Sequence, residues 1–417
     1  MSRLTKSSTS KTTKSGRITG LDTARGIAIL GMIATHIFPL LHLDASGMSA
    51  SPTWAGWAFT GVSSALFVVL AGVGLSILTA HTTHVTATRK QLTVRALVLM
   101  FIGLLLGMVE SYIAIILVHY GVMFLLAMWF ITLSRKALTI TAVTWLVVSP
   151  IVHGVLTRFM QLQAGGTVAY AEEWRLWHSP TLIDVFTQPL LTLWDVLFTG
   201  YYPVISFFGY VLVGMAIGRA DLAKKSTALF LLISGAVTYV VCRGVAAWLL
   251  TDDAFVARIA HATAVAPDEV SIYAATGSGM ETGLLMGAPE WFGLAVPHSG
   301  APLDIYSTAG AAAAAIGFFV LLSRSRIAAK LLFPITATGT IALTAYTLHI
   351  VLRGLWPSTW EEPLAVGDAA WADVWIMLLV HWGMVIALGV VIKLLGKRGP
   401  LEGMLRQLSN SVGRSSS

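Results

Sequence analysis

Three ionisable residues near the start of the chain are spaced so that one helix would carry a charged pair and, further along, an imidazole. Asp22 and Arg25 are three residues apart, so on a helix they share one face and can pair. His36 follows Arg25 by eleven residues, which places it about 16 Å further along a helix. An imidazole there can take a proton from a hydroxyl or amine, or carry an acyl group itself. The alternative is a neutral histidine bonded to a neighbouring helix.

Other histidines, tyrosines and charged residues lie in or beside apolar segments and are candidates to bind or activate a substrate. These candidates are His298, His349, Glu110, Tyr120, Tyr202, Ser299, Arg243 and Arg353. His349 and Arg353 are four residues apart and share a helix face. Arg243 lies inside an apolar segment and needs a partner, for which we expect Glu110 or Asp304. For each candidate the alternative is a hydrogen bond within the bundle, and His381, which no motif surrounds, is the weakest.

The elements that must position these residues are membrane-spanning helices. Of the 417 residues, 56% are hydrophobic and 11% are charged, whereas soluble domains carry about 25% charged residues. The apolar residues come in blocks of about 20, the length that crosses a bilayer core. The composition therefore predicts an all-α, polytopic integral membrane bundle of about ten transmembrane helices. The ten expected spans are Gly26–Leu41, Trp57–Thr79, Val94–Glu110, Ile113–Thr132, Leu138–Leu156, Thr199–Ile217, Ser226–Leu250, Ile305–Leu322, Leu332–Leu355 and Val374–Leu395.

The net charge of +7 is distributed as membrane topology and not as a nucleic-acid footprint. Under a ten-span count, five consecutive basic loops fall on one side, and acidic loops fall on the other. We therefore expect both termini in the cytoplasm of a multi-pass protein of the inner (plasma) membrane. The basic loops and the last basic cluster hold Arg89, Lys90, Arg95, Arg135, Lys136, Arg219, Lys224, Lys225, Arg324, Arg326, Lys330, Lys393, Lys397 and Arg398.

The chain reads as one transmembrane domain with two tails. Residues 1–17 are a disordered basic cytoplasmic tail, residues 18–398 the membrane domain, and residues 399–417 a second cytoplasmic tail. Two polar stretches, at about 158–188 and 251–304, are too long for turns and are predicted to form external caps. The single cysteine, Cys242, excludes an internal disulfide. No His or Cys spacing indicates a metal, and no glycine-rich phosphate loop indicates ATP hydrolysis.

Several short runs resemble the heparan-α-glucosaminide N-acetyltransferase-like family of bacterial membrane proteins. The spacing from Arg25 to His36 also resembles that of the acyltransferase-3 family, which acylates envelope sugars. The matching runs are spread over most of the chain. They are Gly20–Gly31, Thr199–Val204, Gly214–Arg219, Pro297–Gly300 and Leu343–His349.

The resemblance implies an acyltransferase that takes an acyl group, expected to be acetyl, from cytoplasmic acyl-coenzyme A to an extracytoplasmic sugar, glycan or glycolipid. His36, His298 and His349 are then the catalytic candidates. Arg25 and Arg219, with Asp22 paired to the first, would hold the donor's phosphates. The tyrosines, Ser299, Arg353, Glu110 and Arg243 would line the acceptor site. The lysosomal family member has its proposed catalytic histidine before the second span, where residues 51–57 of this chain contain none.

Two other classes of function stay open at this point. A carrier or flippase for a lipid or sugar would also hold charges within the membrane, but it typically shows matched broken spans in two halves, and the hydropathy shows none. A scaffold protein would leave Arg25 and His36 unexplained. Binding of acyl-coenzyme A, or slow release of its thiol, separates the enzyme from both. A homo-oligomer is compatible with the sequence.

Overall fold

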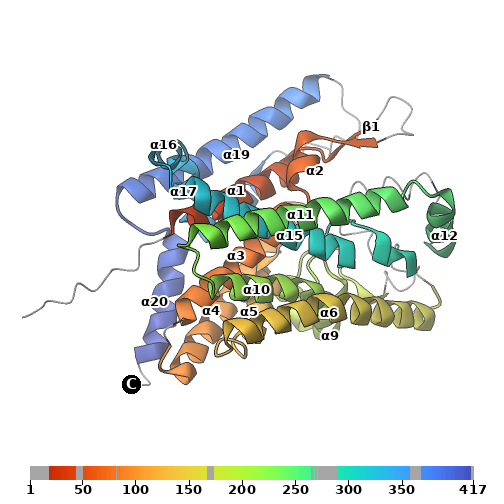
Figure 1. Cartoon of the computed structure of the whole chain (residues 1–417), viewed down its shortest axis with the longest axis horizontal. Helices are drawn as coiled ribbons and strands as arrows, with labels where there is room; N and C mark the ends of the chain where they lie inside the picture. Colours follow the sequence, from red (N-terminus) through yellow and green to blue (C-terminus); the bar gives the residue numbers. More distant parts are fainter. Residues whose placement is uncertain are drawn as a thin grey trace, which may run out of the picture.

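The computed structural model of the chain is a bundle of α-helices (Figure 1). It describes residues 18–43, 50–80, 82–166, 173–263, 267, 270, 289–356 and 368–414. Over these ranges the strands are β1 (Leu41–Leu43) and β2 (Ala50–Pro52), an antiparallel pair. The helices are α1 (Thr19–Ile37), α2 (Trp54–Phe59), α3 (Val62–Thr79), α4 (Val85–Leu106), α5 (Leu117–Ala127), α6 (Arg135–Ala164), α8 (Leu182–Thr187), α9 (Pro189–Trp194), the π-helix η1 (Asp195–Thr199), α10 (Val204–Gly218), α11 (Lys225–Leu249), α12 (Asp253–Thr263), the 3₁₀-helix η2 (Pro289–Gly293), α15 (Pro302–Leu322), α16 (Arg326–Leu331), α17 (Phe333–Gly339), α18 (Ala342–Leu355), α19 (Asp368–Leu394) and α20 (Pro400–Arg414).

The described part of the chain confirms a multi-pass, α-helical membrane protein. Five helical stretches are long and apolar enough to cross a membrane: Trp54–Thr79, α6, α11, α15 and the Trp371–Leu394 part of α19. Two further bent pairs raise the number to seven if each pair is one span. The first pair is α9 and η1 with α10, bent by 54°, and the second is α17 with α18, bent by 86°. The expected number of ten spans and the cytoplasmic location of both termini stay predictions.

Two expected spans have a different internal structure from a straight helix. The segment Leu332–Leu355 divides into α17 and α18, which meet almost at a right angle. The predicted spans on either side of Glu110 are α4 and α5, joined by a non-helical segment over residues 110–116. Ile113, Ile115 and Ile116 of this segment are buried, so it runs through the core. Hydropathy records the burial of a segment and not its direction. The break after Glu110 was expected, but the bend between α17 and α18 and the non-helical conformation of residues 113–116 were not.

Helix α1 lies at the centre of the bundle and is buried along most of its length. It packs against α3, α15, α17, α18 and α19. The contact with α17 is close because glycines face it: a Cβ at Gly26 would lie 2.1 Å from the Ile335 carbonyl oxygen. The helix ends at Ile37 because Phe38, which precedes Pro39, adopts an extended conformation. This arrangement places the Asp22 end and the His36 end of one helix in the interior.

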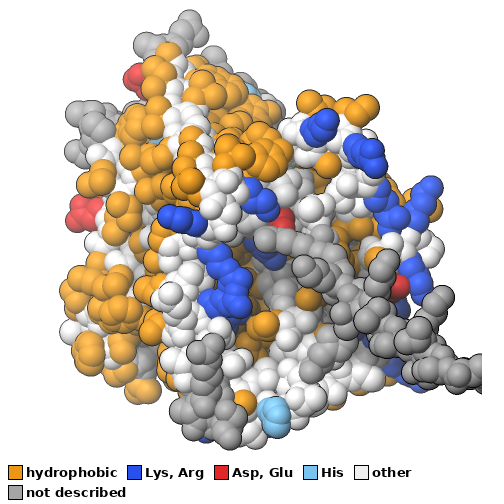
Figure 2. All heavy atoms as spheres, turned by 90° about the vertical axis from the view of Figure 1, so that its left-hand side faces the viewer, with side chains coloured by type: hydrophobic (Ala, Val, Ile, Leu, Met, Phe, Trp, Pro, Cys, Tyr) orange, Lys and Arg blue, Asp and Glu red, His pale blue; other side chains and the backbone are white. Residues whose placement is uncertain are grey.

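The outer helices and the two ends of the bundle carry different side chains. The membrane-length helices α6, α11 and α19 expose apolar side chains along their flanks, as expected for lipid contact. Helix α6 has thirty residues, about 45 Å, and so extends beyond the bilayer core into the stretch predicted as the first cap. Figure 2 looks onto the end of the bundle where α16 and α20 lie, and there Lys and Arg side chains outnumber Asp and Glu.

Candidate active site

Two histidines from distant parts of the sequence make direct contact inside the bundle. Nδ1 of His36, at the end of α1, lies 3.1 Å from Nε2 of His349 in α18. The two rings are nearly parallel, with centroids 5.3 Å apart and an interplanar angle of 7°. His349 is fully buried, whereas His36 is partly accessible. If Nδ1 of His36 donates to His349, Nε2 of His36 keeps a lone pair that can accept a proton from a substrate.

A third histidine and an arginine extend this pair. The ring of His381 in α19 lies edge-on to His349, with centroids 5.0 Å apart. Nδ1 of His381 donates to the Met377 carbonyl oxygen at 2.7 Å, which fixes its tautomer. Arg353, one turn after His349, is buried and close enough for its charge to act on His349. The shared face predicted for His349 and Arg353 is confirmed.

His298, the remaining histidine candidate, lies on the loop that precedes α15 and packs among aromatic rings of the bundle. Its backbone has φ +64, in the left-handed region that non-glycine residues rarely occupy, and Gly300 follows with φ +70. The imidazole lies parallel to Phe207, with centroids 6.0 Å apart, and edge-on to Tyr202 at 5.3 Å. Such local strain is characteristic of functional sites, and here it aims the ring into the bundle.

Aromatic side chains connect the histidines with the other end of α1. The rings of Tyr120 and Tyr346 flank Phe67, with centroids 5.6 and 6.5 Å from it. Tyr346 accepts a hydrogen bond at its hydroxyl from the Ile116 amide at 3.3 Å. It stands one turn before His349 on α18. The rings of Tyr120, Phe67 and Tyr346 therefore form one group that joins α5, α3 and α18.

The predicted pairing at the start of α1 is confirmed. Nη1 of Arg25 lies 3.2 Å from Oδ1 of Asp22, and the arginine side chain keeps 27% of its surface exposed. Thr23, next to Asp22, bonds to Thr336 of α17 through the two hydroxyls at 2.8 Å. Asp22 therefore orients Arg25 while α17 holds this turn of α1 in place.

Four other candidates lie apart from the histidine cluster. Arg219 lines a cavity of about 300 Å³ with Thr79, Thr82, Thr132 and Ser134. Arg219 and Arg25 lie against different sides of α3. Arg25 is beside Gly74, whereas Gly218, the neighbour of Arg219, packs against Val73 and Ser76. Nη1 of Arg243 donates to the Ala295 carbonyl oxygen at 2.8 Å, and its charge acts on buried Asp304, one of its two expected partners. The Ser299 hydroxyl accepts from the Ala301 amide at 3.1 Å, and Glu110 is exposed.

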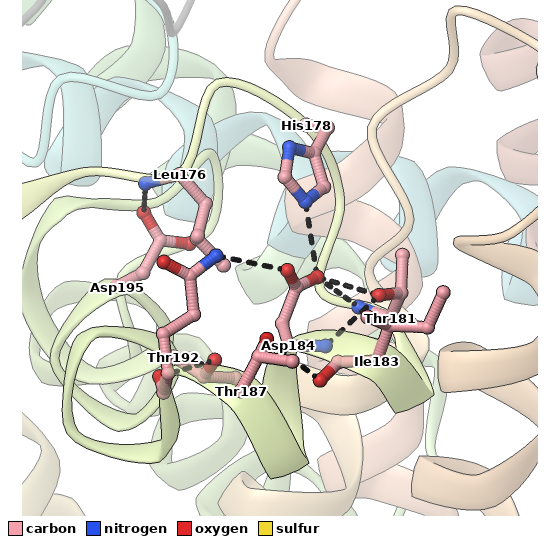
Figure 3. A network of polar contacts seen from close by, with 9 residues as sticks. Leu176, His178, Thr181, Ile183, Asp184, Thr187, Thr192 and Asp195 are labelled. Atoms are coloured by element: carbon pink, nitrogen blue, oxygen red, sulfur yellow. Dashed lines mark hydrogen bonds and ion pairs between the residues drawn. The ribbon is translucent and has the colours of Figure 1, made fainter.

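An outer network holds the loop that runs from Trp174 to Pro180 (Figure 3). Oδ2 of Asp184 accepts from the Thr181 amide at 2.8 Å, its hydroxyl at 2.6 Å and His178 Nε2 at 3.0 Å. Gln188 donates to the other carboxylate oxygen at 3.0 Å. Burial alone would raise the pKa of Asp184, but these hydrogen bonds together lower it below its ordinary value. The network is tied to the core because Ser179 bonds to Ile113 and Ile115.

A group of aromatic rings lies beyond His36, where α1 ends beside α2 and α19. Phe38 contacts Trp54, Trp371 and Trp375 with ring centroids 5.0, 5.4 and 4.9 Å apart. Trp54 and Trp375 stack with an interplanar angle of 11° and keep 36% and 42% of their surfaces exposed. Sequence reasoning missed this group because its members come from three separate helices.

Fold and site together define a polytopic α-helical membrane protein with a histidine cluster within the bundle. Residues 17–228 match the family model described as heparan-α-glucosaminide N-acetyltransferase, catalytic, and the chain belongs to this family. The match includes Arg25, His36, Tyr120 and Tyr202. His298 and His349 lie beyond it. No curated protein matches the chain. Among the residues that the structure describes, no group of three or more His, Cys, Asp or Glu is arranged to hold a metal ion.

Proposed function

We propose that the protein is a membrane acetyltransferase that moves an acetyl group from cytoplasmic acyl-coenzyme A to a sugar, glycan or glycolipid outside. Family membership supports acetyl transfer at a membrane. The observation that carries the proposal is the contact between His36 and His349, because it leaves one imidazole nitrogen available deep in the bundle. The basic end, seen in Figure 2, is assigned to the cytoplasm.

In the proposed reaction, the acceptor oxygen or nitrogen attacks the thioester carbonyl carbon. The new C–O or C–N bond forms, the C–S bond breaks, and the acceptor proton passes to Nε2 of His36. The same proton then neutralises the coenzyme A thiolate, which leaves as the thiol. His349 orients the His36 ring and stabilises the charge that forms on it. In the two-step alternative His36 is acylated first, and the acceptor takes the acetyl group from it.

The two ends of α1 suit the two substrates. Arg25, oriented by Asp22, is a bidentate donor for a phosphate of the nucleotide end. His36 lies eleven residues further along α1, about 16 Å away, which an extended pantetheine arm spans. The exposed, stacked Trp54 and Trp375 provide apolar ring faces for a sugar acceptor beside His36. His298, on the strained loop, is assigned to the acceptor side.

The proposal is tested with the full chain in lipid nanodiscs, using acetyl-coenzyme A labelled in its acetyl group. Glucosamine offers an amine and N-acetylglucosamine offers hydroxyls alone, so the pair also separates N- from O-transfer. We expect acceptor-dependent release of the thiol and a labelled sugar product. Label that stays on the protein without acceptor, and is absent in His36→Gln, would establish the two-step route. The proposal would be rejected if the chain neither bound the donor nor released the thiol.

One observation favours the carrier hypothesis enough to be tested. The two bent helix pairs, α9 and η1 with α10 and α17 with α18, are a feature that discontinuous carrier helices share. In proteoliposomes, a carrier would accumulate labelled glucosamine without acetylating it. The transferase would yield the acetylated sugar and consume the donor.

A further inference from the structure

His381 of α19 is a fully buried histidine that the proposed reaction does not use. Its Nδ1 lies 2.7 Å from the Met377 carbonyl oxygen, one turn earlier on the same helix. A carbonyl oxygen can only accept a hydrogen bond, so Nδ1 of His381 carries a proton and donates it. In a neutral imidazole the other nitrogen is then unprotonated. The helix therefore fixes Nε2 of His381 as a hydrogen-bond acceptor.

The acceptor nitrogen of His381 and the second nitrogen of His349 lie on neighbouring rings. Among the residues that the structure describes, neither Nε2 of His381 nor Nδ1 of His349 has a hydrogen-bond partner, and both side chains are fully buried. The two rings are edge-on with centroids 5.0 Å apart. That separation is within hydrogen-bonding reach, because the centroids of His36 and His349 are 5.3 Å apart and two of their nitrogens lie 3.1 Å from each other. Since an unsatisfied buried polar atom is costly, a hydrogen bond from Nδ1 of His349 to Nε2 of His381 stabilises both rings.

One order of protons satisfies all three rings together. When His349 donates from Nδ1 to His381, its Nε2 is unprotonated and accepts from Nδ1 of His36, which lies 3.1 Å away. Nε2 of His36 then keeps its lone pair. In the opposite order, His349 would donate from Nε2 to His36, and its Nδ1 would be a second acceptor facing the Nε2 acceptor of His381. Two buried acceptors would then lie side by side without a proton between them.

We propose that His381 is a positioning residue that acts through His349 to set the tautomer of His36, so that Nε2 of His36 is the free base. The order of protons follows from the geometry of the three rings and the Met377 carbonyl. Its consequence for acetyl transfer rests on the proposed function. His381 and His349 lie outside residues 17–228, the region that the family model matches, so the family match assigns neither of them a role.

Two substitutions at His381 separate this role from simple packing. His381→Phe keeps an aromatic ring but has no acceptor for His349, whereas His381→Gln loses the ring and keeps an acceptor oxygen. We expect His381→Phe to lower the maximal rate of acetyl transfer about tenfold or more with little change in the donor KM, as for one lost orienting hydrogen bond. His381→Gln should retain most of the activity. The matched control is His84→Phe, at an exposed histidine, which should behave as the wild type. An active Phe variant beside an inactive Gln variant would show that the ring only packs, and would overturn the inference.

Nitrogen NMR of isotope-labelled histidines in nanodiscs reads the tautomers without any turnover. Each ring is assigned by the signal that its own His→Gln variant loses. In the wild type we expect a protonated Nδ1 and an unprotonated Nε2 in His36, His349 and His381. In His381→Phe we expect His36 to become a mixture of its two tautomers.

The spectra keep this inference separate from the proposed function. A wild-type His36 that is protonated at Nε2 overturns the inference, and so does an unchanged His36 signal in His381→Phe. The wild-type spectrum alone decides the order of protons if His381→Phe does not fold. A wild-type chain that shows the expected tautomers but transfers no acetyl group would reject the proposed function and leave the proton order of the three rings standing.

Discussion

His36 and His349 are 313 residues apart in the sequence, yet Nδ1 of the first lies 3.1 Å from Nε2 of the second. Helix α1 supplies one ring and the bent pair of α17 and α18 supplies the other. If His36 is the general base, His36→Ala and His36→Gln should lower acetyl transfer by about 10² or more. An amide forms hydrogen bonds but takes no proton near neutral pH, so Gln should not rescue activity.

The control for this prediction is His84→Gln. His84 is exposed at the start of α4, and its side chain makes no capping hydrogen bond to that helix. Folding and insertion are checked by size-exclusion chromatography and thermal unfolding in detergent. Near wild-type transfer in both His36 variants would make His36 a structural residue and move the search to His298 and His349.

His349 is predicted to act through His36, so the two substitutions should not be additive. His349→Gln should lower the maximal rate because it removes the ring that orients His36. The double variant His36→Gln/His349→Gln should then be no slower than His36→Gln alone. Maximal rates and donor KM values are measured for the wild type, the two single variants and the double variant, which together form a double-mutant cycle. Independent, multiplicative losses would show that the two rings serve separate functions.

The topology prediction follows from the distribution of charge between the two ends of the bundle. In a Cys242→Ala background, Asp252→Cys should react with an impermeant thiol reagent added outside intact cells. Lys224→Cys should react only after the membrane is opened. Both positions are exposed, so burial does not limit the reaction. Equal labelling of the two in intact cells would reverse or abolish the proposed orientation.

The outer network around Asp184 should give a pH-dependent contribution to stability. The pKa of the Asp184 carboxyl is lowered in the folded protein. The stabilisation by its hydrogen bonds is therefore fully present above the pKa of an unfolded Asp, about 3.9, and is lost as the pH falls through the pKa of Asp184 in the folded protein. We expect Asp184→Asn to lower the free energy of unfolding by about 1–3 kcal/mol near pH 7. The difference from the wild type should narrow below about pH 4. Thermal unfolding in detergent across this range measures it, and a difference that does not change with pH would contradict the assignment.

Local spacing predicted several contacts because helix geometry alone determines them. Asp22 and Arg25, three residues apart, were expected to pair, and they do. His349 and Arg353, four residues apart, were expected on one helix face, and both are buried on α18. Contacts between distant helices left little local signal. His381 stood in no motif, yet α19 brings its ring against His349.

Changes of chain direction were also hidden from the sequence. The hydropathy of Leu332–Leu355 fits one straight span, whereas the chain turns by 86° between α17 and α18. The break after Glu110 was expected, but the non-helical conformation continues through residues 113–116, which are as apolar as a helix and mostly buried in the core. Without these breaks His349 would not face His36, so the geometry of the site depends on the part of the fold that hydropathy cannot resolve.

The anchor of the C-terminal helix gives the last prediction. Glu402 accepts three hydrogen bonds at the start of α18, and its charge is favourable there because the first turn of a helix carries a partial positive charge. Glu402→Gln keeps the size of the side chain and one carbonyl oxygen but removes the charge and one acceptor, which should cost about 1–2 kcal/mol. Helix α20 should therefore open more often, and hydrogen exchange over residues 400–414 should accelerate about tenfold. Glu173→Gln, at an exposed glutamate, is the matched control and should leave this exchange unchanged. If α20 exchanges at the wild-type rate in Glu402→Gln, its packing on α4 holds it in place, and Glu402 is not its main anchor.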